Sequence, residues 1–88
     1  MTATNYRELE TVVLERDLPE HGLRRGDLGA IVHLHGPDTF EVEFVRASGL
    51  TQALLTLRAA EVRPVGDEDL IAVRRVDPGA RGLPDDDR

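Results

Sequence analysis

The residues best suited to chemistry are two histidines and two glutamates, each pair spaced two positions apart. His33 and His35 share one face if their segment is a strand, and Glu41 and Glu43 share one face of the next strand. Two imidazoles and a carboxylate are typical ligands of a divalent metal. The pattern lacks a third strong ligand, so we favour solvated histidine–glutamate pairs across two strands over a metal site. We therefore expect no bound metal and no cofactor.

Catalytic roles find little support in the remaining polar residues. His21 lies in a loop beside Glu20, the chain has no cysteine, and its serines and threonines show no recognisable triad spacing. Glu41 and Glu43 have the spacing of paired carboxylates, but no cleft raises a carboxyl pKa on the convex outside of a small β protein. We interpret the chain as a protein without enzymatic activity.

Charge argues against a nucleic-acid partner. The 88 residues carry a net charge of −6, and nucleic-acid affinity is largely an attraction between cations and phosphates. Arg24 and Arg25 form a small basic pair, but both phenylalanines are expected to point inward, which leaves no platform on which bases stack. We favour a solvated arginine pair over a phosphate site.

An apolar patch on the outer face of the predicted sheet is the candidate binding site. Ile31 and Leu54 are expected to face outward beside Glu43, and an exposed apolar patch rimmed by charge is typical of a surface that binds a partner. The alternative is that the apolar run at residues 70–73 covers the patch; this run also suits an added edge strand or a motif that docks on a partner. The sequence leaves these alternatives open. The predicted partner-binding residues are Ile31, His33, Glu41, Glu43 and Leu54.

The clearest element is the strand predicted over residues 40–44. Phe40, Val42 and Phe44 alternate with two glutamates, and a period of two places the apolar side chains on one face and the glutamates on the other. This is the pattern of an antiparallel strand with one buried and one solvated side.

Residues 30–35 are the predicted partner of this strand in a hairpin. Gly36, Pro37 and Asp38 separate the two runs and are typical turn residues. Matching the apolar faces pairs Ala30 with Phe44, Val32 with Val42 and Leu34 with Phe40, and on the outer side pairs Ile31 with Glu43, His33 with Glu41 and His35 with Thr39.

Three further strands are predicted at residues 11–14, 52–57 and 62–65. The first is apolar and rich in β-branched residues, which favour strands. In the second, Ala53, Leu55 and Leu57 alternate inward. Pro64 cannot donate a hydrogen bond to a ladder, so the third strand lies on an edge or ends there.

The sequence also predicts the structure of the connections between the strands and of the C-terminal tail. Residues 59–61 suit a single helical turn, and residues 15–29 are expected to form an ordered loop anchored by Leu18 and Leu23. The sequence predicts an all-β protein, a small five-stranded SH3-like barrel over residues 7–65. Proline, glycine and charge predict that residues 66–88 are a flexible acidic tail, largely disordered.

These elements resemble the domain-of-unknown-function family 4926. The resemblance rests on residues 9–14, on the Gly26-Asp27-Leu28-Gly29 turn, and on residues 40–45 and 62–65, and it covers about residues 8–65. It implies a small bacterial SH3-like domain without established chemistry. Some members of the family lie beside toxin-like genes, which implies an antitoxin-like or accessory role.

The Gly-Asp-x-Gly turn is also similar to turns of KOW-type domains and of the nitrile hydratase β subunit. In such a turn, Gly26 takes a positive φ, Asp27 bonds the backbone two residues on, and Gly29 permits a close approach of neighbouring chain. The fold requires these backbone features whatever the function, so the turn does not indicate one particular function.

We therefore expect a non-enzymatic protein-interaction module. Its partner is another protein, for example a toxin encoded nearby, whose basic groove the acidic chain occludes. The alternatives are a KOW-like nucleic-acid-binding domain and an accessory subunit of an enzyme. The chain has no cysteine and no apolar run suited to a signal peptide or a membrane span, so we expect it in the cytoplasm.

Overall fold

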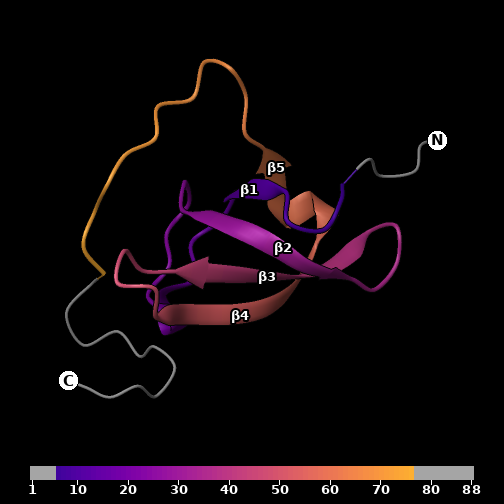
Figure 1. Ribbon diagram of the computed structural model, residues 1–88, viewed down its shortest axis with the longest axis horizontal. Coiled ribbons are helices and arrows are strands. Elements are labelled where there is room, and N and C mark those ends of the chain that lie inside the picture. The colour runs from indigo at the N-terminus through magenta and orange to yellow at the C-terminus, as the bar shows by residue number, and fades with distance from the viewer. Residues whose placement is uncertain (1–5, 77–88) are drawn as a thin grey trace.

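Five antiparallel strands form one sheet in the computed structural model, which describes residues 6–76 (Figure 1). Two short 3₁₀ helices, η1 (Pro19–His21) and η2 (Ala59–Glu61), are the helical elements of this part of the chain. The predicted all-β class is confirmed, and η2 is the helical turn expected before the last strand. The strands are β1 (Thr11–Leu14), β2 (Leu28–Leu34), β3 (Thr39–Val45), β4 (Thr51–Arg58) and β5 (Val62–Pro64), in the order β4-β3-β2-β1-β5.

The first strand, β1, lies between β2 and the last strand, β5. Val12 pairs with Gly29 on one side and with Pro64 on the other. β4 and β5 are therefore the two edges of the hydrogen-bonded sheet, and η2 joins one to the other along the chain. Pro64 ends the short edge strand, as its missing N–H predicts.

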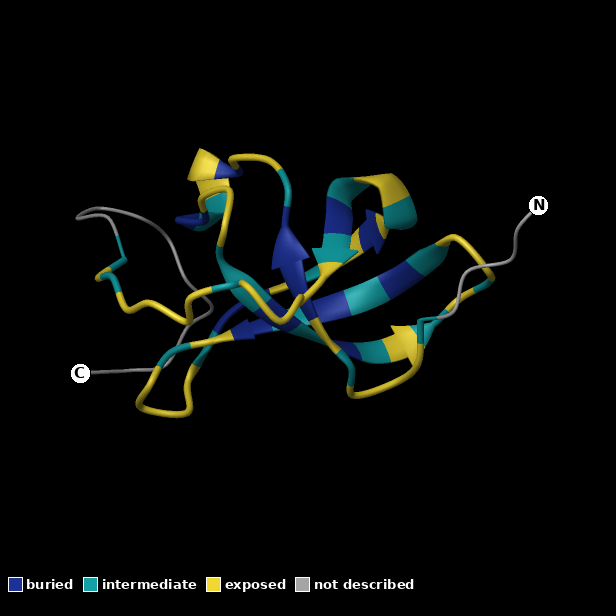
Figure 2. Cartoon of the chain, turned by 90° about the horizontal axis from the view of Figure 1, so that it is seen from above, coloured by how far each residue is buried: buried dark blue, intermediate teal, exposed yellow. Residues whose placement is uncertain are grey.

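The apolar side chains of β3 face a single core, as their alternation predicts. Phe40, Val42 and Phe44 are buried, whereas Glu41 and Glu43 lie on the opposite face with part of their surface exposed. Figure 2 shows buried and more exposed positions alternating along the strands. The same core receives side chains from every other strand and from the loop after β1: Val12, Leu14, Leu18, Leu23, Ile31, Ala53, Leu57 and Val62.

The hairpin of β2 and β3 has the predicted register only near its turn. Leu34 pairs with Phe40 and His33 pairs with Glu41, as the matching of faces predicts. Before His33 the register shifts by one residue, because Val32 is an extra residue in β2 that forms a β-bulge.

The bulge reverses the alternation of β2, so Ile31 points into the core. Its side chain is 0% exposed, and the prediction that Ile31 faces outward is wrong. A period of two does not anticipate an inserted residue, and here the insertion buries isoleucine in place of the smaller Ala30, which removes more apolar surface from water. The predicted pairs Val32–Val42, Ala30–Phe44 and Ile31–Glu43 are wrong for this reason, and the observed pairs are Ile31–Val42 and Ala30–Glu43.

Gly29 in β2 packs so closely against β3 that there is no room for a side chain at this position. A Cβ atom at this position would be 2.6 Å from Val42 Cγ1 and 2.8 Å from Phe44 Cε2. The predicted close approach at Gly29 is confirmed, and the groups that come close are side chains of β3. In the preceding turn Gly26 has a φ of 99°, in the region expected for this glycine.

The long loop between β1 and β2 is ordered and anchored as predicted. Leu18 and Leu23 are buried and form an isolated β-bridge around η1. The buried amide of Gln52 fastens this loop to β4, because its Nε2 donates to the His21 carbonyl at 2.9 Å. The Gln52 Oε1 accepts from Arg46 Nε at 2.7 Å, so both ends of the buried amide are bonded.

After β5 the chain continues as an irregular segment, residues 66–76, which we call the strap. It runs from β5 toward the turn between β3 and β4, in orange in Figure 1, and contains neither helix nor strand. The alternative of an added edge strand at residues 70–73 is therefore wrong. The rest of the predicted tail, residues 77–88, lies outside the described residues. Within residues 6–76, no helix has the length and apolar character needed to cross a membrane.

Replacing Gly29 with alanine is expected to destabilise the fold, because the added methyl overlaps Val42 and Phe44. The free energy of unfolding should fall by about 1–3 kcal/mol, the usual cost of overpacking a core. Gly36→Ala is the matched control, since nothing lies within 4 Å of an added Cβ there; we expect a change below about 0.5 kcal/mol. Chemical denaturation measures both variants, and equal stabilities would contradict this packing of β2 on β3.

Candidate functional site

An arginine–aspartate pair fastens the β5 end of the strap. Arg63 binds Asp69 through Nη1 and Nη2, each 2.8 Å from a carboxylate oxygen. The Gly66 N–H donates to the same carboxylate at 2.6 Å. The Arg63 hydrogen bonds, and after them the Gly66 N–H, lower the pKa of Asp69 to about 2. This carboxylate closes the turn with which the strap begins.

A second pair joins the other end of the strap to the start of β2. Arg74 donates from Nε and Nη2 to the two carboxylate oxygens of Asp27, at 2.9 and 2.5 Å. Its Nη2 also donates to the Gly22 carbonyl at 3.0 Å, and Asp27 accepts the Arg24 N–H at 2.7 Å. Bidentate guanidinium–carboxylate pairs are strong charge-assisted contacts, and most of the surface of these two side chains is covered. The pair therefore holds the strap across the beginning of β2.

Between the two pairs the strap exposes its apolar side chains. Leu70 is 93% exposed, Ile71 65% and Val73 98%. Burying a side chain of this kind is favourable by about 1.5–3 kcal/mol, so leaving three in water is an energetic cost to the free protein. Because the segment is held near both ends, it presents these side chains to solvent beside the sheet.

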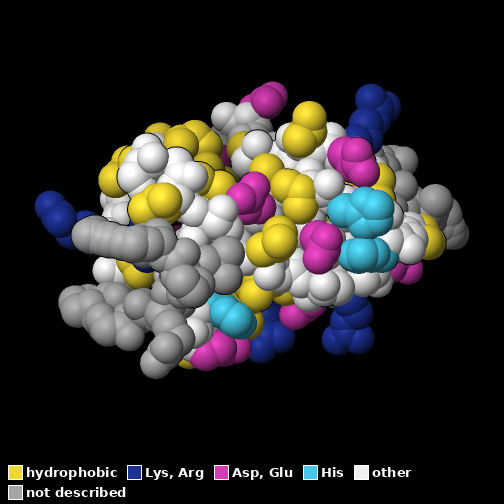
Figure 3. Space-filling model, turned by 60° about the horizontal axis from the view of Figure 1, so that its bottom comes forward, with side chains coloured by type: hydrophobic (Ala, Val, Ile, Leu, Met, Phe, Trp, Pro, Cys, Tyr) yellow, Lys and Arg dark blue, Asp and Glu magenta, His cyan; other side chains and the backbone are white. Residues whose placement is uncertain are grey.

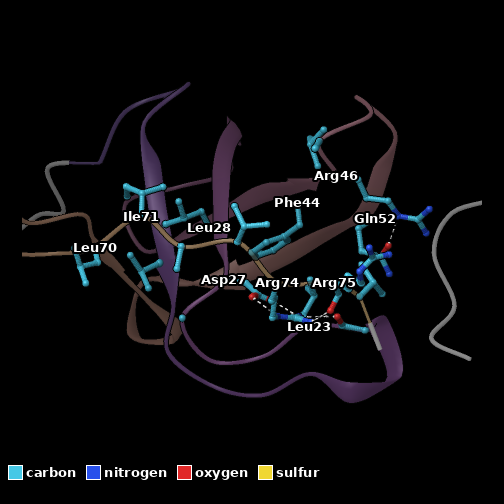
Figure 4. Close-up of a pocket in the computed structure, with 18 of the residues that line it drawn as sticks. Leu23, Asp27, Leu28, Phe44, Arg46, Gln52, Leu70, Ile71, Arg74 and Arg75 are labelled. Atoms are coloured by element: carbon cyan, nitrogen blue, oxygen red, sulfur yellow. Dashed lines mark hydrogen bonds and ion pairs between the residues drawn. The ribbon is translucent and has the colours of Figure 1, made fainter. Parts of the chain in front are cut away.

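An open groove lies between the strap and the sheet (Figure 4). Its volume is about 1050 Å³, at the upper end of the range for ligand pockets. Leu23, Leu28 and Phe44 form an apolar floor, and the strap forms the facing wall with Ile71 and its neighbours.

The described residues that line the groove carry more positive than negative charge, although the chain has a net charge of −6. Figure 4 shows Arg46 and Arg75 near Gln52, at the opposite end of the groove from Leu70 and Ile71. Asp69, which pairs with Arg63, directly precedes Leu70, so charged groups stand at both ends of the groove. Within residues 6–76, its charged lining consists of four arginines and two carboxylates: Arg46, Arg63, Arg74, Arg75, Asp27 and Asp69.

Residues 8–64 match the family described as Domain of unknown function (DUF4926). The chain belongs to this family. The matched residues run from just before β1 to the end of β5, so the DUF4926 domain includes Asp27 and Arg63, whereas Asp69 and Arg74 lie beyond it. No curated protein and no solved structure matches the chain. The resemblance drawn from the sequence is confirmed over nearly the same residues.

The outer face of the DUF4926 domain carries four of the five predicted partner-binding residues. His33 lies opposite Glu41 in the ladder of β2 and β3, and Glu43 lies opposite Leu54 in the ladder of β3 and β4. Ile31, the fifth, lies in the core and does not reach this surface. The predicted apolar pair of Ile31 and Leu54 is therefore absent from the outer face.

The two histidines of the outer face lie together among acidic side chains (Figure 3). The rings of His33 and His35 meet edge to face with centroids 4.6 Å apart. His33 Nδ1 is 3.7 Å from Glu8 Oε2, and His35 Nε2 is 3.8 Å from Glu41 Oε1. In the part of the chain that the structure describes, no three histidine or carboxylate side chains are grouped so that they could hold a metal ion.

The other candidate residues lie in the loop between β1 and β2. His21 ends η1, with its Nε2 4.0 Å from Glu20 Oε2. Arg24 and Arg25 are exposed, and Arg25 Nε lies 3.6 Å from Glu15 Oε1. The loop thus places these charges at its surface, outside the apolar floor of the groove.

The sequence reasoning missed the strap and the groove. The predicted bond from Asp27 to the backbone two residues on is wrong: the Asp27 carboxylate accepts the N–H of Arg24, three residues before it, and the guanidinium of Arg74. The available signal was the apolar run 70–73 with Asp69 before it and Arg74 after it, because these are charges that can hold both ends of a segment.

Acid is expected to release the β5 end of the strap. The pKa of Asp69 is lowered from 3.8 to about 2 in the folded protein, so its pairing stabilises the folded state fully above its ordinary pKa and is lost as the pH falls through the folded value. NMR titration of the Asp69 carboxyl should give a midpoint near pH 2, and the Gly66 amide should shift with it. Asp69→Asn should remove that step from the Gly66 titration. A midpoint near 3.8 would contradict the pair.

Proposed function

We propose that this DUF4926 domain is a non-enzymatic protein-interaction module that presents the strap to its partner. The observation that carries the proposal is the exposure of Leu70 and Val73 on a segment that two ion pairs hold in place. Contiguous exposed apolar side chains rimmed by charge mark surfaces that bind proteins. A segment that is already ordered loses less conformational entropy on binding than a flexible one. A partner that covers the strap buries apolar side chains that are exposed to water in the free protein, and this burial favours binding.

We infer further that the sheet is an SH3-like barrel. Three features support this: β1 lies between β2 and β5, a long loop joins β1 to β2, and a 3₁₀ turn joins β4 to β5. All five strands contribute to one core, and the right-handed twist of a sheet this small brings its two edges round that core. Such a barrel gives the strap a rigid support.

We propose an antitoxin-like or accessory role as the form of this function, on the expectation that some members of the family lie beside toxin-like genes. In the first case the partner is a toxin encoded nearby, and in the second it is a subunit of a larger assembly. The identity of the protein that contacts the strap distinguishes the two.

Site-specific photocrosslinking in the native host tests the interaction. A benzophenone amino acid replaces Val73, and the control places it at Leu9, an apolar residue that is also largely exposed but lies before β1. We expect one discrete crosslinked protein from position 73 and none from position 9. Leu70→Asp should reduce the yield about tenfold, because a charge replaces an apolar contact.

Circular dichroism of Leu70→Asp should match the parent protein, since the side chain is exposed. The absence of a crosslinked protein at position 73, or the same products from both positions, would overturn the proposal. The crosslinked product is identified by mass spectrometry, and a second copy of this chain is one of the partners that would support it.

A further inference from the structure

We propose that the outer edge of β4 pairs with the same edge of a second copy of this chain, antiparallel and with the twofold axis at Leu55. The inference goes beyond the proposed function, because it concerns an edge of the sheet and does not involve the strap. Within residues 6–76, β4 pairs with β3 alone, and in Figure 1 it lies along the outside of the sheet. An unpaired strand edge is a template for pairing with another strand.

The ladder of β3 and β4 shows which backbone groups of β4 point away from the sheet. The Ala59 N–H donates to the Asp38 carbonyl at 2.8 Å, so Ala59 directs its hydrogen-bonding groups toward β3. This pair continues the one-to-one register of the ladder, which runs from there to Leu54 without a bulge. Because backbone groups alternate in direction along a strand, the N–H and C=O groups of Leu54 and Thr56 point outward.

The two ends of this edge fix the register of the pair. The Arg58 N–H is bonded to Glu61 Oε1 at 2.8 Å, and Gln52 is the extra residue at which the ladder with β3 shifts. Leu54 and Thr56 are therefore the regular outward positions between these ends. When Leu54 of each copy lies opposite Thr56 of the other, every outward N–H and C=O group of the two residues is paired. A register shifted by two residues in either direction brings in Arg58 or Gln52 and forms fewer bonds.

The side chains along the edge suit pairing. Residues 51–57 contain neither charge nor proline, which are two of the features that protect natural edge strands. Leu54 is 47% exposed on the outer face, and the partly buried Leu55 lies on the core side. The proposed pair places Leu55 of the two copies directly opposite each other, so their remaining exposed surface is covered. The other edge strand, β5, has three residues and ends in Pro64, so it lacks these properties.

Charge is compatible with a second copy as the occupant, although each chain has a net charge of −6. In the proposed pair Glu41 and Glu43 of one copy are three strands from those of the other, about 14 Å at the usual strand spacing. This separation exceeds the screening length of roughly 8 Å at physiological salt. Arg58 of one copy lies only two strands from Glu43 of the other, on the same face. On the outer face of β3 and β4, the closest charges across the axis are thus of opposite sign.

Sedimentation equilibrium of the full chain tests the proposal. We expect a monomer–dimer equilibrium with a Kd of about 0.1 mM, in the range of weak interfaces. Leu54→Lys should raise this Kd at least about tenfold, because a charge on an edge strand opposes pairing. Leu70→Lys is the matched control on the strap and should leave the Kd unchanged. Both variants add one positive charge to a chain of net charge −6, so a general effect of charge would strengthen the association of both.

Disulfide formation tests the register, since the chain has no cysteine of its own. In the proposed pair Leu55 lies opposite Leu55 at a position without hydrogen bonds, where Cα atoms are about 4.5 Å apart and within the range of a disulfide. Under mild oxidation Leu55→Cys should form a covalent dimer at least about tenfold faster than Thr56→Cys, although position 56 is the more exposed. Circular dichroism checks that both variants fold.

Three outcomes overturn the inference. The first is a parent chain that stays monomeric up to about 1 mM. The second is a dimer that Leu70→Lys weakens as much as Leu54→Lys does, because the contact then lies on the strap. The third is disulfide formation that is equally fast at positions 55 and 56. Crosslinking from position 73 tests the proposed function separately, and its result does not depend on pairing at β4.

Discussion

Asp27 joins the loop before β2 to two parts of the molecule that are distant in sequence, the end of β1 and the strap. Its carboxylate accepts the N–H of Arg24 from the loop and the guanidinium of Arg74 from the strap, while the carbonyl of Asp27 accepts the Leu14 N–H from the end of β1 at 2.8 Å. A largely covered carboxylate is stable only when its oxygens are paired, and here the strap provides the charged partner. The Asp27 carboxylate therefore fixes the position of the strap by binding Arg74. The groove forms between the sheet and the strap held in this position.

The inward-facing residues were predictable in the strand segments that pair residue by residue, without a β-bulge. Phe40 and Val42 in β3 and Leu57 in β4 point inward as their alternation predicts, since a buried face requires a period of two. The prediction failed in β2, where Val32 is an extra residue and sends Ile31 to the core. Pattern alone does not locate a bulge, because both registers of β2 offer apolar residues to the interior, and packing against β3 decides between them.

The exposed apolar surface that we propose as the binding site lies on a different element from the one that the sequence predicts. The sequence predicts an apolar patch rimmed by charge around Leu54. Within residues 6–76, the most exposed large apolar side chains are instead Leu70 and Val73 on the strap. Their position depends on the Arg74–Asp27 pair, whose members are 47 residues apart. Spacing within a segment gives no information about such a contact, whereas the positive φ of Gly26 belongs to a local turn whose residues are neighbours in sequence.

Paramagnetic relaxation from a single spin label tests most directly whether the strap lies across the start of β2. The chain has no cysteine, so Arg25→Cys provides one labelling site on an exposed residue. Position 25, Asp27 and residues 72–74 line the same small hollow. We predict strong broadening of the amide signals of residues 72–74 in the labelled protein, and recovery of those signals when the nitroxide is reduced. Signals of residues 72–74 that are equally sharp before and after reduction would contradict the placement of the strap.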